Sequence, residues 1–186
     1  MRPKAMIFGN VRLDGARECD AASLIVIHDP EATKRFSFFD ETLTLNREEA
    51  YLRRMVESPS DLLWIVRSTN SEKAVVGTAG LHEVDIPVGT ARLGVIIWNK
   101  KSQGFGYGTA AIHALCHYAF TALGVSKVYA NVRIANDRGR AYYARLGFAE
   151  EGVLPGSYVQ NGESSDMVHM SILKQEWQDC QNREDQ

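Results

Sequence analysis

A glycine-rich segment, Gln103 to Gly108, lies between an apolar stretch and a segment with helical periodicity. The apolar stretch, Arg92 to Trp98, is typical of a mostly buried strand, and apolar residues recur at helical spacing after the glycines. Glycines permit a tight turn without a Cβ, so successive N–H groups can face one anion. The dipole and the first N–H groups of the following helix add to that attraction. The segment therefore predicts a site for a phosphate-bearing cofactor.

The spacing of the glycines separates three kinds of phosphate-binding loop. A Walker loop requires a lysine directly after its last glycine, whereas Thr109 follows Gly108 here. A dinucleotide fingerprint requires G-x-G-x-x-G with an acidic residue about 20 positions later. This chain has G-x-G-x-G, and its next strand ends in Asn131-Val132-Arg133 without a carboxylate. Neither loop fits.

The third pattern is Gln103-x-x-Gly106-x-Gly108, which resembles the [Gln/Arg]-x-x-Gly-x-[Gly/Ala] signature of the GCN5-related N-acetyltransferases (GNAT). The residues that follow keep that family's order. A strand at Lys127 to Val132 precedes a helix that Asn136 introduces and that carries Tyr143, and Gly147-Phe148 closes it. The resemblance implies a mixed α/β fold, with a central mixed sheet and helices on both faces, and an acetyl-coenzyme A-dependent N-acetyltransferase.

The resemblance extends over the block from Ala91 to Trp177 and is strongest to the branch that holds ribosomal-protein N-terminal and spermidine acetyltransferases. It implies that main-chain N–H groups of the glycine turn hold the diphosphate of acetyl-CoA. It also implies that the end of the preceding strand, which splays from its neighbour in this family, pairs with the pantetheine arm. The cofactor-binding residues expected on this basis are Val95, Ile96, Ile97, Gln103, Gly104, Phe105, Gly106, Tyr107, Gly108, Thr109 and Asn136.

Tyr143 is the candidate general acid, because the resemblance places it at the helix tyrosine that faces the cofactor sulfur. A phenol with an ordinary pKa of about 10 stays protonated at neutral pH and can donate to a departing thiolate. A packed helix tyrosine is the alternative, as the adjacent Tyr142 illustrates. Asn136 likewise has two interpretations, since asparagine is also a good N-cap for the helix that follows.

The general base is ambiguous in the sequence. Polyamine-acetylating relatives usually carry a glutamate where this chain has Arg92, and an arginine cannot accept a proton. Glu83 is the candidate general base, acting directly or through water, and the adjacent His82 is an alternative. His82 is more simply interpreted as a strand residue. Cys116 is interpreted as structural, and the pattern implies no metal.

The acceptor is expected to be a primary amine, attacking the bound thioester directly. A protein α-amine titrates near 7.7–8.0 and a lysine or polyamine amine near 10.4. Deprotonation at neutral pH therefore costs roughly 4–5 kcal/mol for the second and about 1 kcal/mol for the first. The missing carboxylate at position 92 tilts the prediction toward a protein or peptide α-amine or another small amine. A polyamine, an amine antibiotic, or a catalytically idle acyl-CoA-binding sensor are the alternatives.

The elements that must position these residues follow from periodicity. Strands are expected at Ile7–Leu13, Leu62–Arg67, Ala74–Glu83 and Arg92–Trp98, with a turn at 71–73. Helices are expected at about Asp20–His28 and Asn46–Glu57, the second with Asn46 and Glu49 as a capping box. The whole order is βααβββαβαββ. An aromatic cluster between the two helices could line the acceptor pocket or could be core: Phe36, Phe38 and Phe39.

Length and composition set the remaining limits. We expect a single GNAT domain over residues 1–186, with acceptor-side elements at about 1–90, the cofactor half at about 91–177 and a solvated polar tail at 178–186. A net charge of −2 gives no reason to expect nucleic acid, and no apolar stretch suits a membrane. Three scattered cysteines and no evident signal peptide favour a cytoplasmic protein. A homodimer is expected by analogy alone.

Overall fold

The computed structural model describes residues 3–30, 43–70, 74–160 and 162–184. The predicted aromatic cluster at Phe36–Phe39 and the predicted turn at 71–73 lie outside these ranges. The chain forms two compact units. Unit 1 comprises Met1–Glu83 and Leu93–Leu115, and unit 2 comprises Val84–Arg92 and Cys116–Gln186.

Unit 1 begins with two short strands, β1 (Met6–Phe8) and β2 (Val11–Gly15), which pair antiparallel. β2 pairs with β3 (Leu62–Ser68), and β3 pairs with β4 (Val75–Asp85), both antiparallel. β3 is buried along almost its whole length because both of its faces are covered.

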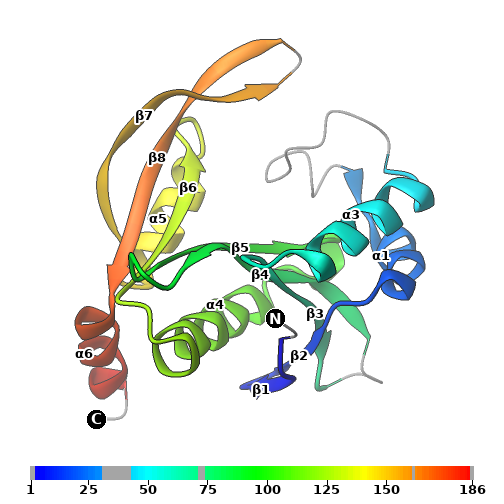
Figure 1. The fold of residues 1–186 in the computed structure, drawn as a ribbon, viewed down its shortest axis with the longest axis horizontal. Helices are drawn as coiled ribbons and strands as arrows, with labels where there is room; N and C mark the ends of the chain where they lie inside the picture. Colours follow the sequence, from blue (N-terminus) through cyan, green and yellow to red (C-terminus); the bar gives the residue numbers. More distant parts are fainter. Residues whose placement is uncertain (1–2, 31–42, 71–73, 161, 185–186) are drawn as a thin grey trace. The chain divides into compact units, whose positions relative to one another are not determined.

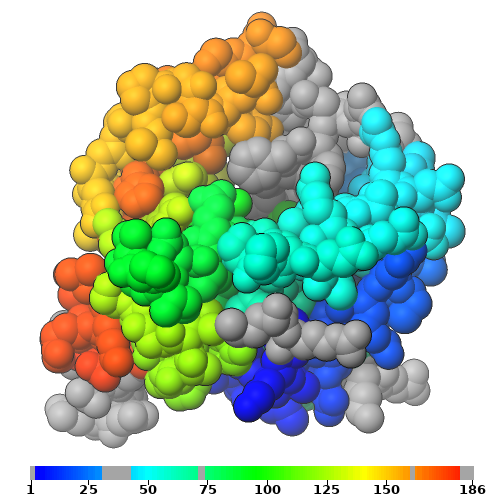
Figure 2. Space-filling model, viewed as in Figure 1, coloured from blue at the N-terminus to red at the C-terminus, as the bar shows by residue number. Residues whose placement is uncertain are grey.

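Two helices of unit 1, α1 (Ala21–Ile27) and α3 (Leu45–Glu57), pack on one face of these strands, and α4 (Tyr107–Tyr118) lies on the other (Figure 1). A short 3-10 turn, η1 (Glu18–Asp20), leads into α1. The core beneath the two helices joins their apolar residues to those of β3 and Trp98: Ala21, Leu24, Leu52, Leu63, Ile65. The opposite side of α3 is exposed, and Figure 2 shows this helix in cyan on the surface.

The segment that carries the glycine turn follows β4. β5 (Thr90–Ile97) leads through a 3-10 turn, η2 (Lys100–Ser102), to α4 (Tyr107–Tyr118), whose last turn widens into a π-helical segment, η3 (Ala119–Leu123). Strand, glycine turn and helix therefore occur in the predicted order.

Unit 2 is built on β6 (Lys127–Arg133) and the long hairpin of β7 (Ala149–Gln160) and β8 (Glu163–Leu173). β8 pairs antiparallel with both β6 and β7. α5 (Asp137–Arg145) connects β6 to β7, and α6 (Lys174–Glu184) follows β8. β5 pairs with β6 in parallel over Thr90–Arg92. The strand order is β1-β2-β3-β4-β5-β6-β8-β7, so the predicted mixed sheet with helices is confirmed.

Three local predictions were wrong. The single strand expected at Ile7–Leu13 is the β1–β2 hairpin, because Gly9 takes a left-handed φ of 52° and turns the chain. α3 begins at Leu45 after Thr44, which has no side-chain cap bond, so Asn46 is not the N-cap. The tail expected from residue 178 is helical through Glu184.

The physical reason for the C-terminal helix is visible at its start. The Glu176 carboxylate accepts a hydrogen bond of 2.9 Å from the Leu173 N–H, and Trp177 is buried against Phe120. A capped first turn and one buried aromatic side chain hold a helix that is otherwise polar. No helix in the described ranges is long and apolar enough to cross a membrane.

Candidate active site

The glycine turn is shaped by two residues with positive φ. Gly104 has φ 85° and Gly106 has φ 80°, conformations that residues with a Cβ rarely adopt. A Cβ on Gly104 would meet no described atom within 4 Å, so the backbone conformation and not crowding requires glycine there. α4 begins directly after Gly106, and the first N–H groups of an α-helix have no acceptor within the helix. The turn can therefore present main-chain donors to an anion.

Two hydrogen bonds from elsewhere in unit 1 fix the turn. Asn10, in the β1–β2 hairpin, donates from Nδ2 to the carbonyl oxygen of Phe105 at 2.7 Å. The hydroxyl of Tyr107 lies 3.0 Å from the hydroxyl of Ser68 at the end of β3, where both are buried. No sequence pattern pointed to Asn10 or Ser68, because each is an isolated polar residue far from the turn along the chain.

The residues expected to meet the pantetheine arm lie in the last part of β5. Val95, Ile96 and Ile97 are each half-buried, although the strand is interior to the sheet. The parallel ladder with β6 includes only the first residues of β5, Thr90 to Arg92, among the described pairs. The end of the strand is anchored instead toward β4, where the Trp98 N–H donates to the Val76 carbonyl at 3.0 Å.

Asn136 is the N-cap of α5. Its Oδ1 accepts a hydrogen bond of 2.9 Å from the Gly139 N–H, which satisfies one of the first donors of the helix. A Cβ on Gly139 would lie 2.5 Å from the Asn136 amide nitrogen, so a glycine at 139 is what allows this cap. The capping interpretation of Asn136 is thus observed, while a cofactor contact stays a prediction.

Tyr143 lies on α5 with its ring against Phe148, at a centroid distance of 5.2 Å and an interplanar angle of 65°. Its carbonyl accepts from the N–H groups of Leu146 and Phe148, where the helix ends and Gly147 takes a φ of 89°. Burial raises the pKa of the Tyr143 phenol well above its ordinary value, and the neighbouring Tyr142 and Cys116 add to the shift. The phenol is therefore fully protonated at neutral pH.

Glu83 lies near the end of β4 and is exposed, with a left-handed φ of 52°. No other non-glycine residue in the described ranges has a positive φ. The Glu83 N–H is directed at Asp61 Oδ1 at 3.4 Å. The same oxygen lies 3.0 Å from Nδ1 of His82, so one carboxylate contacts two consecutive residues of the strand.

Asp61 was not singled out from the sequence. It follows α3 in the chain, and Ser58 donates to its Oδ2 at 2.6 Å. Burial raises the pKa of Asp61, but hydrogen bonds from Ser58, His82 and the Glu83 N–H outweigh it and leave the pKa below its ordinary value. Asp61 is therefore a carboxylate at neutral pH.

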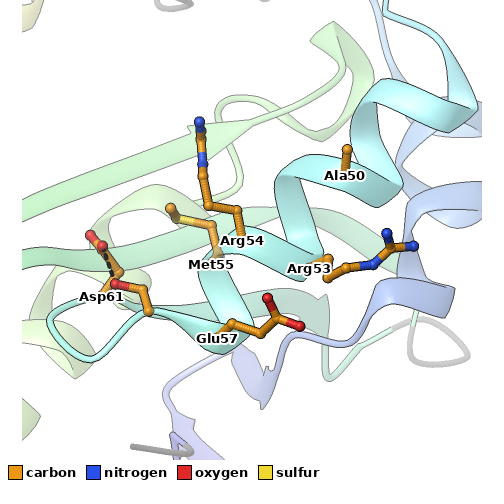
Figure 3. A pocket seen from close by; sticks show the side chains of 7 residues that line it. Ala50, Arg53, Arg54, Met55, Glu57 and Asp61 are labelled. Carbon is orange, nitrogen blue, oxygen red and sulfur yellow. Dashed lines mark hydrogen bonds between the residues drawn. The ribbon is translucent and has the colours of Figure 1, made fainter.

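A pocket of about 560 Å³ runs along α3 and ends at Asp61 (Figure 3). Arg53 and Arg54 point to different sides of the helix in this view. Glu57 is the last residue of α3, and Asp61 lies in the segment after it. Arg53 is paired with Glu18. The pocket combines cationic and anionic groups, so charge alone selects no ligand class for it.

Comparison with known proteins places the chain among acetyltransferases. The family model described as "Acetyltransferase (GNAT) domain" matches residues 10–149. The chain is 28% identical over 170 residues to the "Putative ribosomal N-acetyltransferase YdaF" of Bacillus subtilis, covering 90% of this chain and 92% of that protein. It is 30% identical over 108 residues to the spermidine N(1)-acetyltransferase of Vibrio cholerae, covering 58% of this chain and 62% of that one.

Solved structures share the fold. The crystal structure of a "putative acetyltransferase" from T. thermophilus superposes with a TM-score of 0.84 at 24% identity, covering 98% of this chain and 96% of that chain. The Vibrio cholerae spermidine N-acetyltransferase, solved in complex with CoA and spermine, has a TM-score of 0.78 at 22% identity, covering 91% of this chain and 98% of that chain.

Proposed function

This chain belongs to the GNAT family of N-acetyltransferases, and we propose that it transfers the acetyl group of acetyl-CoA to the α-amine of a protein or peptide or to another weakly basic small amine. The cofactor follows from the family. The observation that carries the assignment of the cofactor site is the glycine turn between β5 and α4, where two left-handed glycines directly precede the helix. The donors of such a turn suit the diphosphate of acetyl-CoA.

For the cofactor, we propose contacts along one continuous stretch of chain. Main-chain groups of Gln103 to Thr109 bind the diphosphate, and the half-buried end of β5, Val95 to Ile97, pairs with the pantetheine amides. The limited ladder between β5 and β6 supports this proposal, because main-chain donors and acceptors of a strand otherwise pair with a neighbour. The Asn136 amide is proposed as a further contact, beside its observed capping bond.

Tyr143 is proposed as the acid that protonates the leaving thiolate. The phenol is in its protonated, donor form across the neutral range, as a general acid must be before it donates. The reaction then needs no covalent enzyme intermediate. Cys116, the buried thiol of α4, has a pKa raised by burial and is a poor nucleophile at neutral pH.

Basicity and charge both favour an α-amine as the acceptor. Arg92 stands where a glutamate is expected in polyamine-acetylating relatives, so a carboxylate that would bind and deprotonate a polycation is missing there. An α-amine needs only about 1 kcal/mol for deprotonation at neutral pH. The similarity to a ribosomal N-acetyltransferase extends over 90% of this chain, against 58% for the spermidine enzyme. That enzyme's acceptor makes a polyamine the second candidate.

The test is release of free thiol from acetyl-CoA across matched acceptors: peptides with free N-termini, the same peptides blocked at the N-terminus, polyamines and aminoglycosides. We expect turnover with free N-termini and none with the blocked peptides. Tyr143→Phe should lower kcat by about 100-fold while leaving the Kd for acetyl-CoA unchanged, since only proton donation is removed. Turnover confined to polyamines would show that the acceptor is a polyamine and not an α-amine. Full activity in Tyr143→Phe would show that Tyr143 is not the general acid.

A further inference from the structure

His82 and Asp61 form a hydrogen-bonded pair in unit 1. Nδ1 of the imidazole lies 3.0 Å from Oδ1 of the carboxylate, and the two side chains are 13% and 18% exposed. Because a carboxylate only accepts, Nδ1 carries the proton in this bond and Nε2 of the neutral ring carries the lone pair. The pair therefore fixes which ring nitrogen is basic.

The strand around His82 directs that nitrogen over β4 and β5. A Cβ built on Gly80, two residues earlier on β4, would lie 2.6 Å from Nε2. A Cβ built on Gly94 of β5 would lie 3.5 Å from Nε2, and the other described atom within 4 Å of it also belongs to His82. Two glycines thus leave room for the Nε2 edge of the ring beside Gly94, the residue before Val95.

The left-handed Glu83 helps to hold this arrangement. A non-glycine residue at φ 52° is strained, and such strain persists where surrounding contacts hold it. Asp61 contacts the residue before the strained one, through the His82 ring, and the strained residue itself, through the Glu83 N–H. Ser58 in turn donates to the second oxygen of Asp61. The left-handed conformation of Glu83 and the orientation of His82 therefore involve the same carboxylate.

Resting on the proposed function, we propose that His82 is the general base of the acetyl transfer and that Asp61 is its positioning residue. A proton passes from the acceptor nitrogen to Nε2, forming an imidazolium that Asp61 stabilises. The amine nitrogen bonds to the thioester carbon, and the C–S bond breaks. The thiolate takes a proton from the acid of the reaction, and the nitrogen of the new amide gives its remaining extra proton back to the conjugate base of that acid. The imidazolium releases its proton to water. This assignment replaces Glu83, whose main-chain N–H contacts the same carboxylate.

The primary experiment compares kcat/KM for a free N-terminal peptide, at saturating acetyl-CoA, between wild type and His82→Gln. We expect a loss of about 100-fold or more at pH 7, with acetyl-CoA affinity unchanged. The loss should shrink as pH rises, because solution then supplies the free amine. His117→Gln, which alters an exposed histidine of α4, is the matched control and should retain wild-type kinetics. Imidazole in the buffer should partly restore His82→Ala.

Two further variants test orientation without removing the imidazole. Asp61→Asn should shift the ring toward the other tautomer in histidine NMR spectra and lower kcat, whereas a purely structural Asp61 would change stability alone. Gly80→Ala should push the ring aside at small cost in stability, because its close contacts are side-chain atoms of His82 and Leu63. We expect kcat/KM to fall about tenfold or more in it, as for a misplaced base.

The outcomes separate the two proposals. If the wild type is active and His82→Gln or Gly80→Ala has unchanged turnover, His82 is not the general base. The proposed acetyltransferase function still stands in that case. Loss of turnover in Glu83→Gln with His82→Gln fully active assigns the base to Glu83 instead. Absence of turnover by wild type with every amine overturns the proposed function, and the base with it.

Discussion

Glu48 is a buried carboxylate on α3 with an exposed fraction of 1%. Neither of its oxygens has a hydrogen-bond partner among the described residues. Burial raises the pKa of Glu48 to about 7, because the charged form would lose its hydration without gaining a partner. Between the ordinary value of about 4.3 and 7, the unfolded chain releases this proton while the folded chain keeps it. The free energy of unfolding therefore falls as pH rises through that window.

Replacing Glu48 by glutamine removes this pH dependence. We expect the difference in the free energy of unfolding, Glu48→Gln minus wild type, to grow by about 2–3 kcal/mol from about pH 4.5 to about pH 7.5. Urea unfolding at a series of pH values measures it. Glu49→Gln, next along the helix and only partly buried, is the control and should show a much smaller change. A difference for Glu48→Gln that stays constant with pH would contradict the assignment.

At the scale of elements, the approach of β4 to β5 depends on one glycine. A Cβ on Gly77 would lie 2.1 Å from the carbonyl oxygen of Ile96 and 3.2 Å from the Cα of Ile97. These are main-chain atoms, so no rotation of a side chain can relieve the clash. The strand segment proposed to meet the pantetheine arm is thus packed directly against Gly77.

Gly77→Ala should lower the free energy of unfolding by about 3 kcal/mol, because β5 must move away from β4. The midpoint of urea unfolding reports it. Gly152→Ala is a matched change in a strand where the new Cβ would meet no described atom within 4 Å, and it should stay within about 0.5 kcal/mol of wild type. Equal midpoints for the two variants would show that β4 and β5 are not held this closely.

The elements that the sequence predicted well are those whose signal is local. The strands before the glycine turn show apolar runs bounded by turn residues, and the turn itself is a pattern of six consecutive residues. The β1–β2 hairpin was missed although Gly9-Asn10 is a two-residue turn signal, because the strands on either side of it are only three and five residues long. The pairing of Asp61 with His82 could not be predicted, because the two residues are 21 positions apart in the chain. They meet only when β4 has packed beside the segment that follows α3.

For the molecule as a whole, acetyl-CoA should act as a stabilising ligand. A ligand that binds only the folded chain, present at 100 times its Kd, raises the free energy of unfolding by about 2.7 kcal/mol. For a chain of 186 residues this corresponds to a rise in Tm of about 5–10 °C. Thermal unfolding followed by circular dichroism measures it. Pantetheine at the same concentration lacks the diphosphate and should give a much smaller rise; an equal rise would contradict the role proposed for the glycine turn.

The hydrogen bond from Asn10 to Phe105 has a consequence for how the chain folds. It joins residues 95 positions apart, so the cofactor turn reaches its final shape only after a long loop has closed. Long-range contacts of this kind form slowly, because the entropy of loop closure opposes them until the contact is made. A folding chain in which the β1–β2 hairpin has not yet packed against the glycine turn lacks this hydrogen bond, so its cofactor site is incomplete. Acetyl-CoA should therefore slow unfolding of the finished protein far more than it accelerates refolding.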